Sequence, residues 1–145
     1  MAEEFAALGG SVVRDHVLDA TALLCVLFAE EGWDQIESLL PRASISAVTY
    51  HEVLTKLDDL GVSMGEARAI IDALDVHIVA VDRKQTDLGT RFRDGSGSKS
   101  LSLGERSCLA LTKMLQAVAV TTDREWTRFD LGVKINVIHQ TTAPS

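Results

Sequence analysis

Short apolar runs recur along the chain, and longer segments with helically spaced apolar positions separate them. Such runs are typical of strands buried in a sheet, and residues 77–81 in particular run apolar rather than alternate. Because the runs alternate with helical segments, we expect an α/β fold whose parallel sheet is covered by helices on both faces. The predicted strands are residues 12–18, 43–47, 77–81, 117–121 and 134–138.

Caps and helix breakers set the boundaries of the helical segments. Residues 20–30 are apolar almost all round, which predicts a helix buried between the sheet and its neighbours. Residues 63–66 and 102–105 each have the serine-to-glutamate spacing of a capping box, which marks a helix start. Residues 95–98 predict a flexible loop, too short to divide domains. The predicted helices are residues 20–30, 33–40, 48–60, 64–74, 82–93 and 103–115.

Composition narrows the class of protein. With 145 residues, 46% of them hydrophobic, the chain is long enough for a single domain with a sizeable core. A net charge of −7 disfavours a nucleic-acid partner, although a local basic patch can differ from the total. Cys25 and Cys108 lie in apolar helical segments, so we expect buried free thiols. Residues 1–11 predict a loose arm rather than a signal peptide, no apolar run would span a bilayer, and we expect a cytoplasmic protein.

Two acids lie just after the ends of predicted strands. Asp19 comes after the first strand and Asp123 after the fourth, so both are expected at the carboxyl edge of the sheet, where ligands bind in such folds. Each acid also has an ordinary explanation. Asp19 and Asp123 could cap the segments that follow them, and Glu105 could be the capping-box partner of Ser102. On helical periodicity alone, Glu52 is a solvated side chain.

Several other chemistries find little support. His51 and Glu52 begin a zinc-protease helix motif, but its second histidine is missing. Residues 95–100 make a poor phosphate loop, because no strand precedes them and no glycine stands directly before Lys99. A phosphatase that uses an aspartyl phosphate would carry a second aspartate two residues after Asp19, where Thr21 stands; this lowers the phosphatase interpretation without removing it.

Four stretches in order along the chain carry a family resemblance. They are residues 17–22 (VLDATA), 46–53 (SAVTYHEV), 101–106 (LSLGER) and 121–126 (TTDREW). Together they resemble the PIN-domain ribonucleases and, among these, the VapC-type toxins of prokaryotic toxin–antitoxin pairs. The resemblance runs from about residue 17 to residue 138. It implies a single PIN-like nuclease domain over residues 12–145, built as a three-layer α/β/α sandwich with a parallel central sheet.

The resemblance also implies a metal site. It implies one or two Mg²⁺ or Mn²⁺ ions held by four catalytic acids, with two polar helpers beside them. Independently, four carboxylates cannot converge and stay ionised without cations, since two of them about 4 Å apart repel by roughly 4 kcal/mol at an effective dielectric of 20. Glu105 stands where the family more often has Asp. The implied acids are Asp19, Glu52, Glu105 and Asp123, and the helpers are Thr21 and Thr122.

The partners follow from the same resemblance. It implies an RNA substrate, a small cognate antitoxin that covers the acidic cleft, and a homodimer. Basic residues crowd before the proposed site and could guide RNA to it, though they could equally form a solvated helix face. Two alternatives remain: a catalytically silent PIN-like protein-binding module, and a phosphohydrolase of small phosphate esters. The candidate RNA-binding residues are Arg91, Arg93, Lys99, Arg106 and Arg124.

Overall fold

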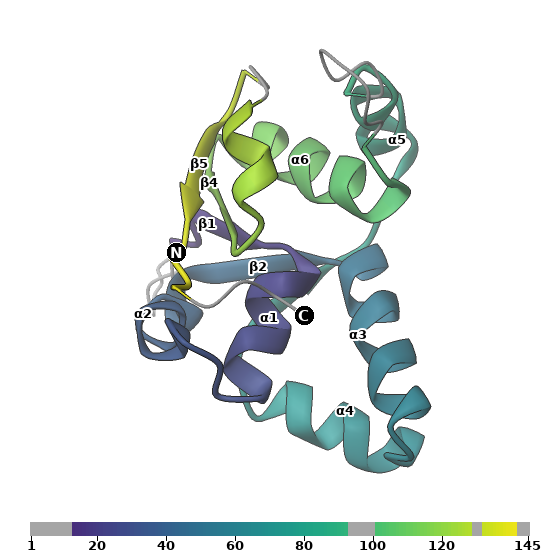
Figure 1. Ribbon diagram of the computed structural model, residues 1–145. Helices are drawn as coiled ribbons and strands as arrows, with labels where there is room; N and C mark the ends of the chain where they lie inside the picture. Colours follow the sequence, from purple (N-terminus) through teal and green to yellow (C-terminus); the bar gives the residue numbers. More distant parts are fainter. Residues whose placement is uncertain (1–12, 93–100, 129–131, 142–145) are drawn as a thin grey trace.

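A parallel five-stranded sheet forms the centre of the computed structural model, which describes residues 13–92, 101–128 and 132–141 (Figure 1). The strands lie in the order β3-β2-β1-β4-β5, and all neighbouring pairs are parallel. This confirms the predicted parallel sheet. The strands are β1 (His16–Leu18), β2 (Ala43–Ser46), β3 (His77–Val79), β4 (Val118–Thr121) and β5 (Lys134–Val137).

Helices connect the strands. The helix predicted over 103–115 is found with the same bounds, and most of the others are shorter than predicted by a few residues at one or both ends. The α-helices are α1 (Ala20–Leu27), α2 (Trp33–Glu37), α3 (Ala47–Asp59), α4 (Met64–Asp72), α5 (Arg83–Thr90) and α6 (Leu103–Leu115); the short 3-10 turns are η1 (Leu40–Arg42) and η2 (Arg124–Arg128).

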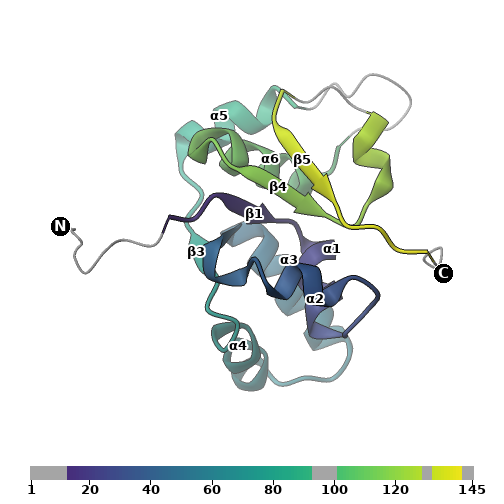
Figure 2. The same cartoon turned by 90° about the vertical axis from the view of Figure 1, so that its left-hand side faces the viewer.

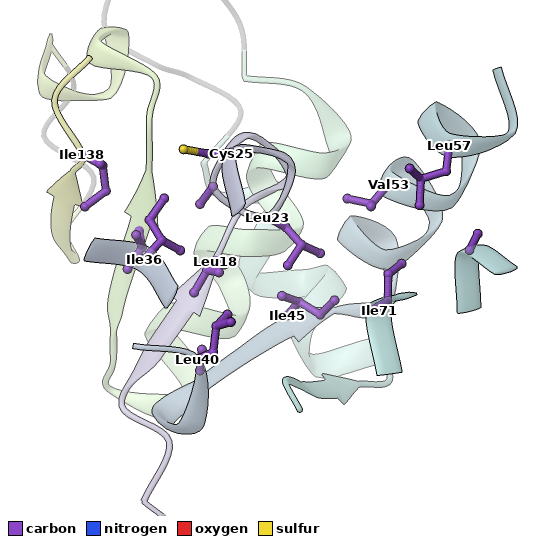
Figure 3. Close-up of a cluster of buried hydrophobic side chains, with 14 residues drawn as sticks. Leu18, Leu23, Cys25, Ile36, Leu40, Ile45, Val53, Leu57, Ile71 and Ile138 are labelled. Carbon is purple, nitrogen blue, oxygen red and sulfur yellow. The ribbon is translucent and has the colours of Figure 1, made fainter. Parts of the chain in front are cut away.

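Alternation along the strands divides the core between two faces of the sheet. Val17 packs with α6 residues on one face, whereas Leu18, the next residue of β1, packs with α1 residues on the other. Helices α5 and α6 cover the first face and α1 to α4 the second (Figure 1 and Figure 2). The larger apolar cluster, drawn in Figure 3, includes Ile45 and Val53. The predicted three-layer α/β/α sandwich is therefore confirmed.

Helix α1 ends at Leu27, three residues earlier than expected. Ala29 has a left-handed φ of 51°, and its N–H donates to the carbonyl of Val26 (3.2 Å). The N–H of Glu30 reaches back to the carbonyl of Cys25 (2.9 Å). These two bonds close the last turn in the Schellman arrangement, which stops a helix even without glycine.

Two expectations about the strands and helices are wrong. The strand at 77–81 was expected to be buried, but β3 is an edge strand paired only with β2; His77 is exposed and Val79 half-buried. Sequence alone does not give strand order, so an apolar run can lie at an edge. The helix expected over 33–40 ends at Glu37, and Pro41 lies in the separate turn η1.

Some predictions fall on parts of the chain outside the described residues: the arm 1–11, the loop 95–98, and the candidate RNA-binding residues Arg93 and Lys99. Both cysteines are buried and free, as predicted. Across residues 13–92, 101–128 and 132–141, no helix is both long and apolar enough to cross a membrane.

Candidate functional site

The candidate site lies at the carboxyl edge of the sheet, where β1 and β4 run side by side. Asp19 follows β1 directly, and its backbone N–H donates to the carbonyl of Val120 on β4 (3.1 Å). Thr121 is the last residue of β4 and is fully buried. The ends of two adjacent strands thus place an acid and a threonine against each other.

Asp19 is the most constrained acid of the site. Its Oδ1 accepts hydrogen bonds from the Thr21 hydroxyl (2.7 Å) and the Ala22 N–H (2.9 Å), and its Oδ2 accepts from the Thr121 hydroxyl (2.5 Å). The side chain is only 5% exposed. Burial raises the pKa of Asp19 from 3.8 to about 6; the three hydrogen bonds oppose that shift and the charge of Asp123 adds to it. Asp19 is both the N-cap of α1 and the buried centre of the site.

The threonines form a short network around Asp19. The Thr21 hydroxyl lies 3.2 Å from that of Thr121 and also accepts from the backbone N–H of Thr122 (3.0 Å). The Thr121 hydroxyl accepts from the N–H of Asp123 (3.0 Å). Thr121, which was not among the expected helpers, thus contributes its hydroxyl to this network, and Thr122 contributes its backbone N–H.

Asp123 has two neighbours of different kinds. Its Oδ1 accepts from the N–H of Glu125 (2.9 Å), so it caps the turn η2, which was the ordinary explanation for this residue. Its charge nevertheless raises the pKa of Asp19, which places the two acids within electrostatic reach. The capping role and a role in the site are compatible, because a carboxylate can accept about four hydrogen bonds or ligands.

Glu52 approaches the site from α3. Partial desolvation by its neighbours first, and then the charge of Glu105, raise the pKa of Glu52. Its carboxylate lies over Gly104 in the first turn of α6: a Cβ on Gly104 would overlap both carboxylate oxygens. Gly104 therefore leaves the space that the Glu52 carboxylate occupies. The Glu52 side chain remains exposed, as periodicity predicts, but it faces another helix and not bulk solvent alone.

Glu105 completes a capping box at the start of α6. Its Oε1 accepts from the backbone N–H of Ser102 (2.8 Å), while its own N–H donates to the Ser102 hydroxyl (3.1 Å). Its Oε2 accepts from the indole N–H of the buried Trp126 (3.3 Å). The capping explanation for Glu105 is thus confirmed, and these contacts also fix its carboxylate beside the site.

Three of the four acids line one cavity. Asp19, Glu52 and Glu105 line a space of about 350 Å³. Asp123 instead lines a second space of about 510 Å³, and Thr21 borders both. The buried thiol of Cys108 lies near the first cavity: burial raises its pKa well above the ordinary value, and the charges of the same three acids raise it further.

The donor set fits a hard divalent cation in chemistry. All four acids supply oxygen, the ligand atom that Mg²⁺ and Mn²⁺ prefer. Asp19 accepts three hydrogen bonds of about four that its carboxylate can take, which leaves one position on Oδ2. Among the described residues, no group of three His, Cys, Asp or Glu side chains is already arranged to hold a metal ion. The acids would therefore have to draw closer around one.

The candidate RNA-binding residues within the described ranges lie on different elements. Arg124 is exposed and borders the same cavity as Asp123. Arg91 is exposed at the end of α5, and Arg106 lines a third cavity between α5 and α6. In the described part of the chain, none of the three arginines forms an ion pair with an acid.

Sequence reasoning missed three residues of this site. Thr121 could have been found, because it ends a predicted strand at the edge that carries the acids. Gly104 and Trp126 could not, since their parts depend on how α3 and η2 pack against α6. No local pattern reports a contact between segments so far apart in sequence.

Comparison with known proteins finds a matching family and several structures of similar fold. The sequence matches the model of the PIN domain family over residues 16–131. In fold, the chain is similar to the toxin–antitoxin complex from Klebsiella pneumoniae, with a TM-score of 0.68, 15% identity, and coverage of 86% of this chain and 98% of that one. It is also similar to VapBC2 from Rickettsia felis bound to promoter DNA, with a TM-score of 0.67, 12% identity, and coverage of 84% and 97%.

A third similar structure is DNA-bound VapBC from Salmonella typhimurium, with a TM-score of 0.66, 16% identity, and coverage of 85% of this chain and 97% of that one. At such identities the likeness shows the fold alone. None of the curated proteins matches the sequence.

Proposed function

The chain belongs to the PIN domain family, and from this premise we propose that it is a metal-dependent endoribonuclease that hydrolyses RNA phosphodiester bonds. We propose further that it is the toxin of a toxin–antitoxin pair. Two of the structures similar in fold are named as VapBC complexes and one as a toxin–antitoxin complex, which supports this part. Its antitoxin would be a small protein that covers the acidic cleft, and the toxin itself would be a homodimer.

One observation carries the proposal: a buried carboxylate, Asp19, faces a cavity that Glu52 and Glu105 also line. Burying an acid is unfavourable, as its raised pKa shows, and the three hydrogen bonds to it only partly offset the cost. A merely structural cap would not need burial, because serine or threonine caps a helix as well. The arrangement is better explained by a cation that the acids hold together.

The chain's own residues would orient the site. Thr21 and Thr121 fix both oxygens of Asp19, so one lone pair points away from the network. Gly104 keeps room for Glu52. One or two Mg²⁺ or Mn²⁺ ions, held by Asp19, Glu52, Glu105 and Asp123, would supply an activated water and neutralise charge on the phosphodiester. Arg124, beside Asp123, would bind the RNA backbone.

The two alternatives fit less well. A silent PIN-like module has no need for four acids, and all four keep their charge-bearing side chains here. A phosphohydrolase that works through a nucleophilic Asp19 would carry a second aspartate two residues on, where Thr21 stands, and the Thr21 hydroxyl instead donates to Asp19 Oδ1. Neither alternative is favoured by a specific contact of the structure.

Cleavage of RNA by the purified protein tests the proposal. Wild type, Asp19→Asn and the exposed-site control Asp72→Asn would each be incubated with RNA and Mn²⁺ or Mg²⁺, and again with EDTA. We expect cleavage by wild type and by the control only when metal is present, and none by Asp19→Asn. Absence of any cleavage by wild type, or cleavage that EDTA does not suppress, would contradict the proposal.

A further inference from the structure

A third cavity, of about 300 Å³, lies between α5 and the first turns of α3 and α6. None of the four acids lines it. Three apolar side chains line it, Val48, Val81 and Leu103, together with the polar side chains of Gln85 and Arg106. The remaining lining residues are Thr86, Gly89, Thr90 and Ser107. Val81 and Leu103 are 39% and 65% exposed, so apolar surface is left open to solvent here. We call this third cavity the side cavity.

Within the described part of the chain, Gln85 and Arg106 each have a buried side-chain atom without a hydrogen-bond partner. Gln85 is only 5% exposed; its Nε2 donates to the carbonyl of Ala80 (2.9 Å), but its buried Oε1 has no hydrogen-bond partner among the described residues. The buried Nε of Arg106 likewise has no hydrogen-bond partner among the described residues. A buried polar atom without a partner is unfavourable and calls for an explanation, of which a ligand is one.

The side cavity is next to the acidic one. Successive residues at the start of α6 line the two in turn: Leu103 and Arg106 face the side cavity, whereas Gly104 and Glu105 face the acids. On α3, Val48 lines the side cavity and Glu52 the acidic one, and side chains four residues apart on a helix lie about 5–6 Å from each other. A strand cleaved at the acids would therefore pass within one nucleotide's reach of the side cavity.

The chemistry of the walls selects the occupant. Apolar side chains on several sides suit a flat ring, and the Gln85 amide and the Arg106 guanidinium, which line the same cavity, suit the edge of a heteroaromatic base. Arg106 alone would also attract a phosphate, but a phosphate would gain nothing from Val48 or Leu103. We propose that the side cavity holds one nucleobase of the RNA strand that the acids cleave. This inference rests on the proposed ribonuclease function and adds base preference to it.

Binding without metal tests the inference separately from cleavage. The dissociation constants of labelled oligo(A), oligo(C), oligo(G) and oligo(U) RNA would be measured by fluorescence anisotropy in EDTA. We expect wild type to rank the four with a spread of roughly 5- to 150-fold, the range that one well-made base contact gives. Gln85→Met and Arg106→Met should each narrow this spread, because each removes one edge contact.

Arg124→Met is the matched control. Arg124 lines the second space, beside Asp123, and not the side cavity, so its loss should weaken the binding of all four RNAs by a similar factor and leave their ranking unchanged. The readout is a ratio of dissociation constants between RNAs, so a uniform weakening of binding or a loss of active protein does not change it. Leu103→Ala, at an exposed position, provides a variant that is expected to fold even where Gln85→Met does not.

Each outcome decides. If wild type binds and cleaves RNA but ranks the four alike, or if the variants keep the wild-type spread, the base-binding inference is wrong and the ribonuclease function stands. If wild type neither binds nor cleaves any RNA, the proposed function fails and the inference with it. If Leu103→Ala converts a dimer to a monomer in light scattering while the spread stays the same, a second copy of the chain occupies the side cavity instead.

Discussion

Two helices of this protein start with nearly the same four residues. Helix α4 begins with Ser63-Met64-Gly65-Glu66, and α6 with Ser102-Leu103-Gly104-Glu105; in each the serine is the N-cap. In both, the serine hydroxyl accepts from the N–H of the glutamate three residues on. At α4 nothing lies within 4 Å of where a Cβ on Gly65 would be, whereas at α6 the Glu52 carboxylate fills that space over Gly104. The local sequence makes a helix start; what packs against it makes a site.

The two glutamates differ in the same way. Glu66 is exposed and accepts from the Ser63 hydroxyl (3.1 Å). Glu105 is half-buried, accepts from a backbone N–H and from the Trp126 indole, and lines the acidic cavity. Comparing Glu66 with Glu105 therefore separates helix capping, which both glutamates provide, from the chemistry that only Glu105 can supply.

The largest expected difference is in catalysis. Glu105→Ala should lower metal-dependent RNA cleavage by at least about 10²-fold, while Glu66→Ala should leave it unchanged, because only Glu105 lies with the other acids. Combined with Glu52→Gln, the loss should fall well short of the product of the single losses, as for residues that act as a unit. Single-turnover rates on one RNA measure this. Equal rates for the two alanine variants would remove Glu105 from the site.

A comparable effect is expected in the pH dependence of stability. Since burial raises the pKa of Asp19 from 3.8 to about 6, the folded protein binds this proton more tightly than the unfolded chain. Its contribution to stability is therefore full below about pH 4 and is lost as pH rises through 6, by about 3 kcal/mol. Urea unfolding in EDTA at several pH values between 4 and 7 should show this loss in wild type.

Asp19→Asn is the variant that isolates this effect, since it cannot ionise. It should lack most of the decline and be at least as stable as wild type at pH 7 without metal, against the usual cost of about 1 kcal/mol for a substitution. Glu66→Ala should keep the wild-type decline. A slope in Asp19→Asn equal to that of wild type would show that other groups cause the pH dependence.

A smaller effect is expected from the two glycines. Gly104→Ala adds a methyl group where the Glu52 carboxylate lies, so that carboxylate must swing away. Because a shift of about 1 Å can cost roughly 10²-fold in rate, we expect cleavage to fall by at least about tenfold. Gly65→Ala, at the same helix position, should leave the rate unchanged. Neither should destabilise the fold, since alanine favours a helix by about 0.5–1 kcal/mol over glycine.

The smallest expected effect concerns capping alone. Glu105→Ala loses the bond to the Ser102 N–H and should cost about 0.5–2 kcal/mol of stability, whereas Glu66→Ala, whose partner is an exposed hydroxyl, should cost less. Glu105→Asp should retain or improve cleavage, since the resemblance has Asp there, even if it caps less well. Melting temperatures and rates on the same proteins separate the two roles.

The comparison also shows where the sequence was informative. Asp19 and Asp123 could be placed at one edge because each comes at or just beyond the end of an apolar strand, and parallel strands end at the same edge. Helix α6 could be bounded to the residue by Ser102 and its capping box. These features depend on neighbours in the sequence, which is why they could be predicted.

The rest depends on contacts between distant segments. Periodicity gave Glu52 as a solvated side chain, and it is exposed; that it faces Gly104 follows from how α3 packs against α6. The position of β3 at the edge likewise follows from strand order, which no local pattern contains. Only the family resemblance pointed to Glu52 and Glu105 together. The capping pattern could not single out Glu105, because the starts of α4 and α6 have nearly the same sequence.

The most direct test of the central claim, that the acids share a metal site, needs no substrate. Thermal melts of wild type, Asp19→Asn and Glu66→Ala would be recorded in EDTA and then in Mn²⁺. A cation at a hundred times its dissociation constant adds about 2.7 kcal/mol, which raises the melting temperature by roughly 5–10 °C in a domain of this size. We expect that gain in wild type and Glu66→Ala and little of it in Asp19→Asn. No gain in wild type, or an equal gain in Asp19→Asn, would contradict the account.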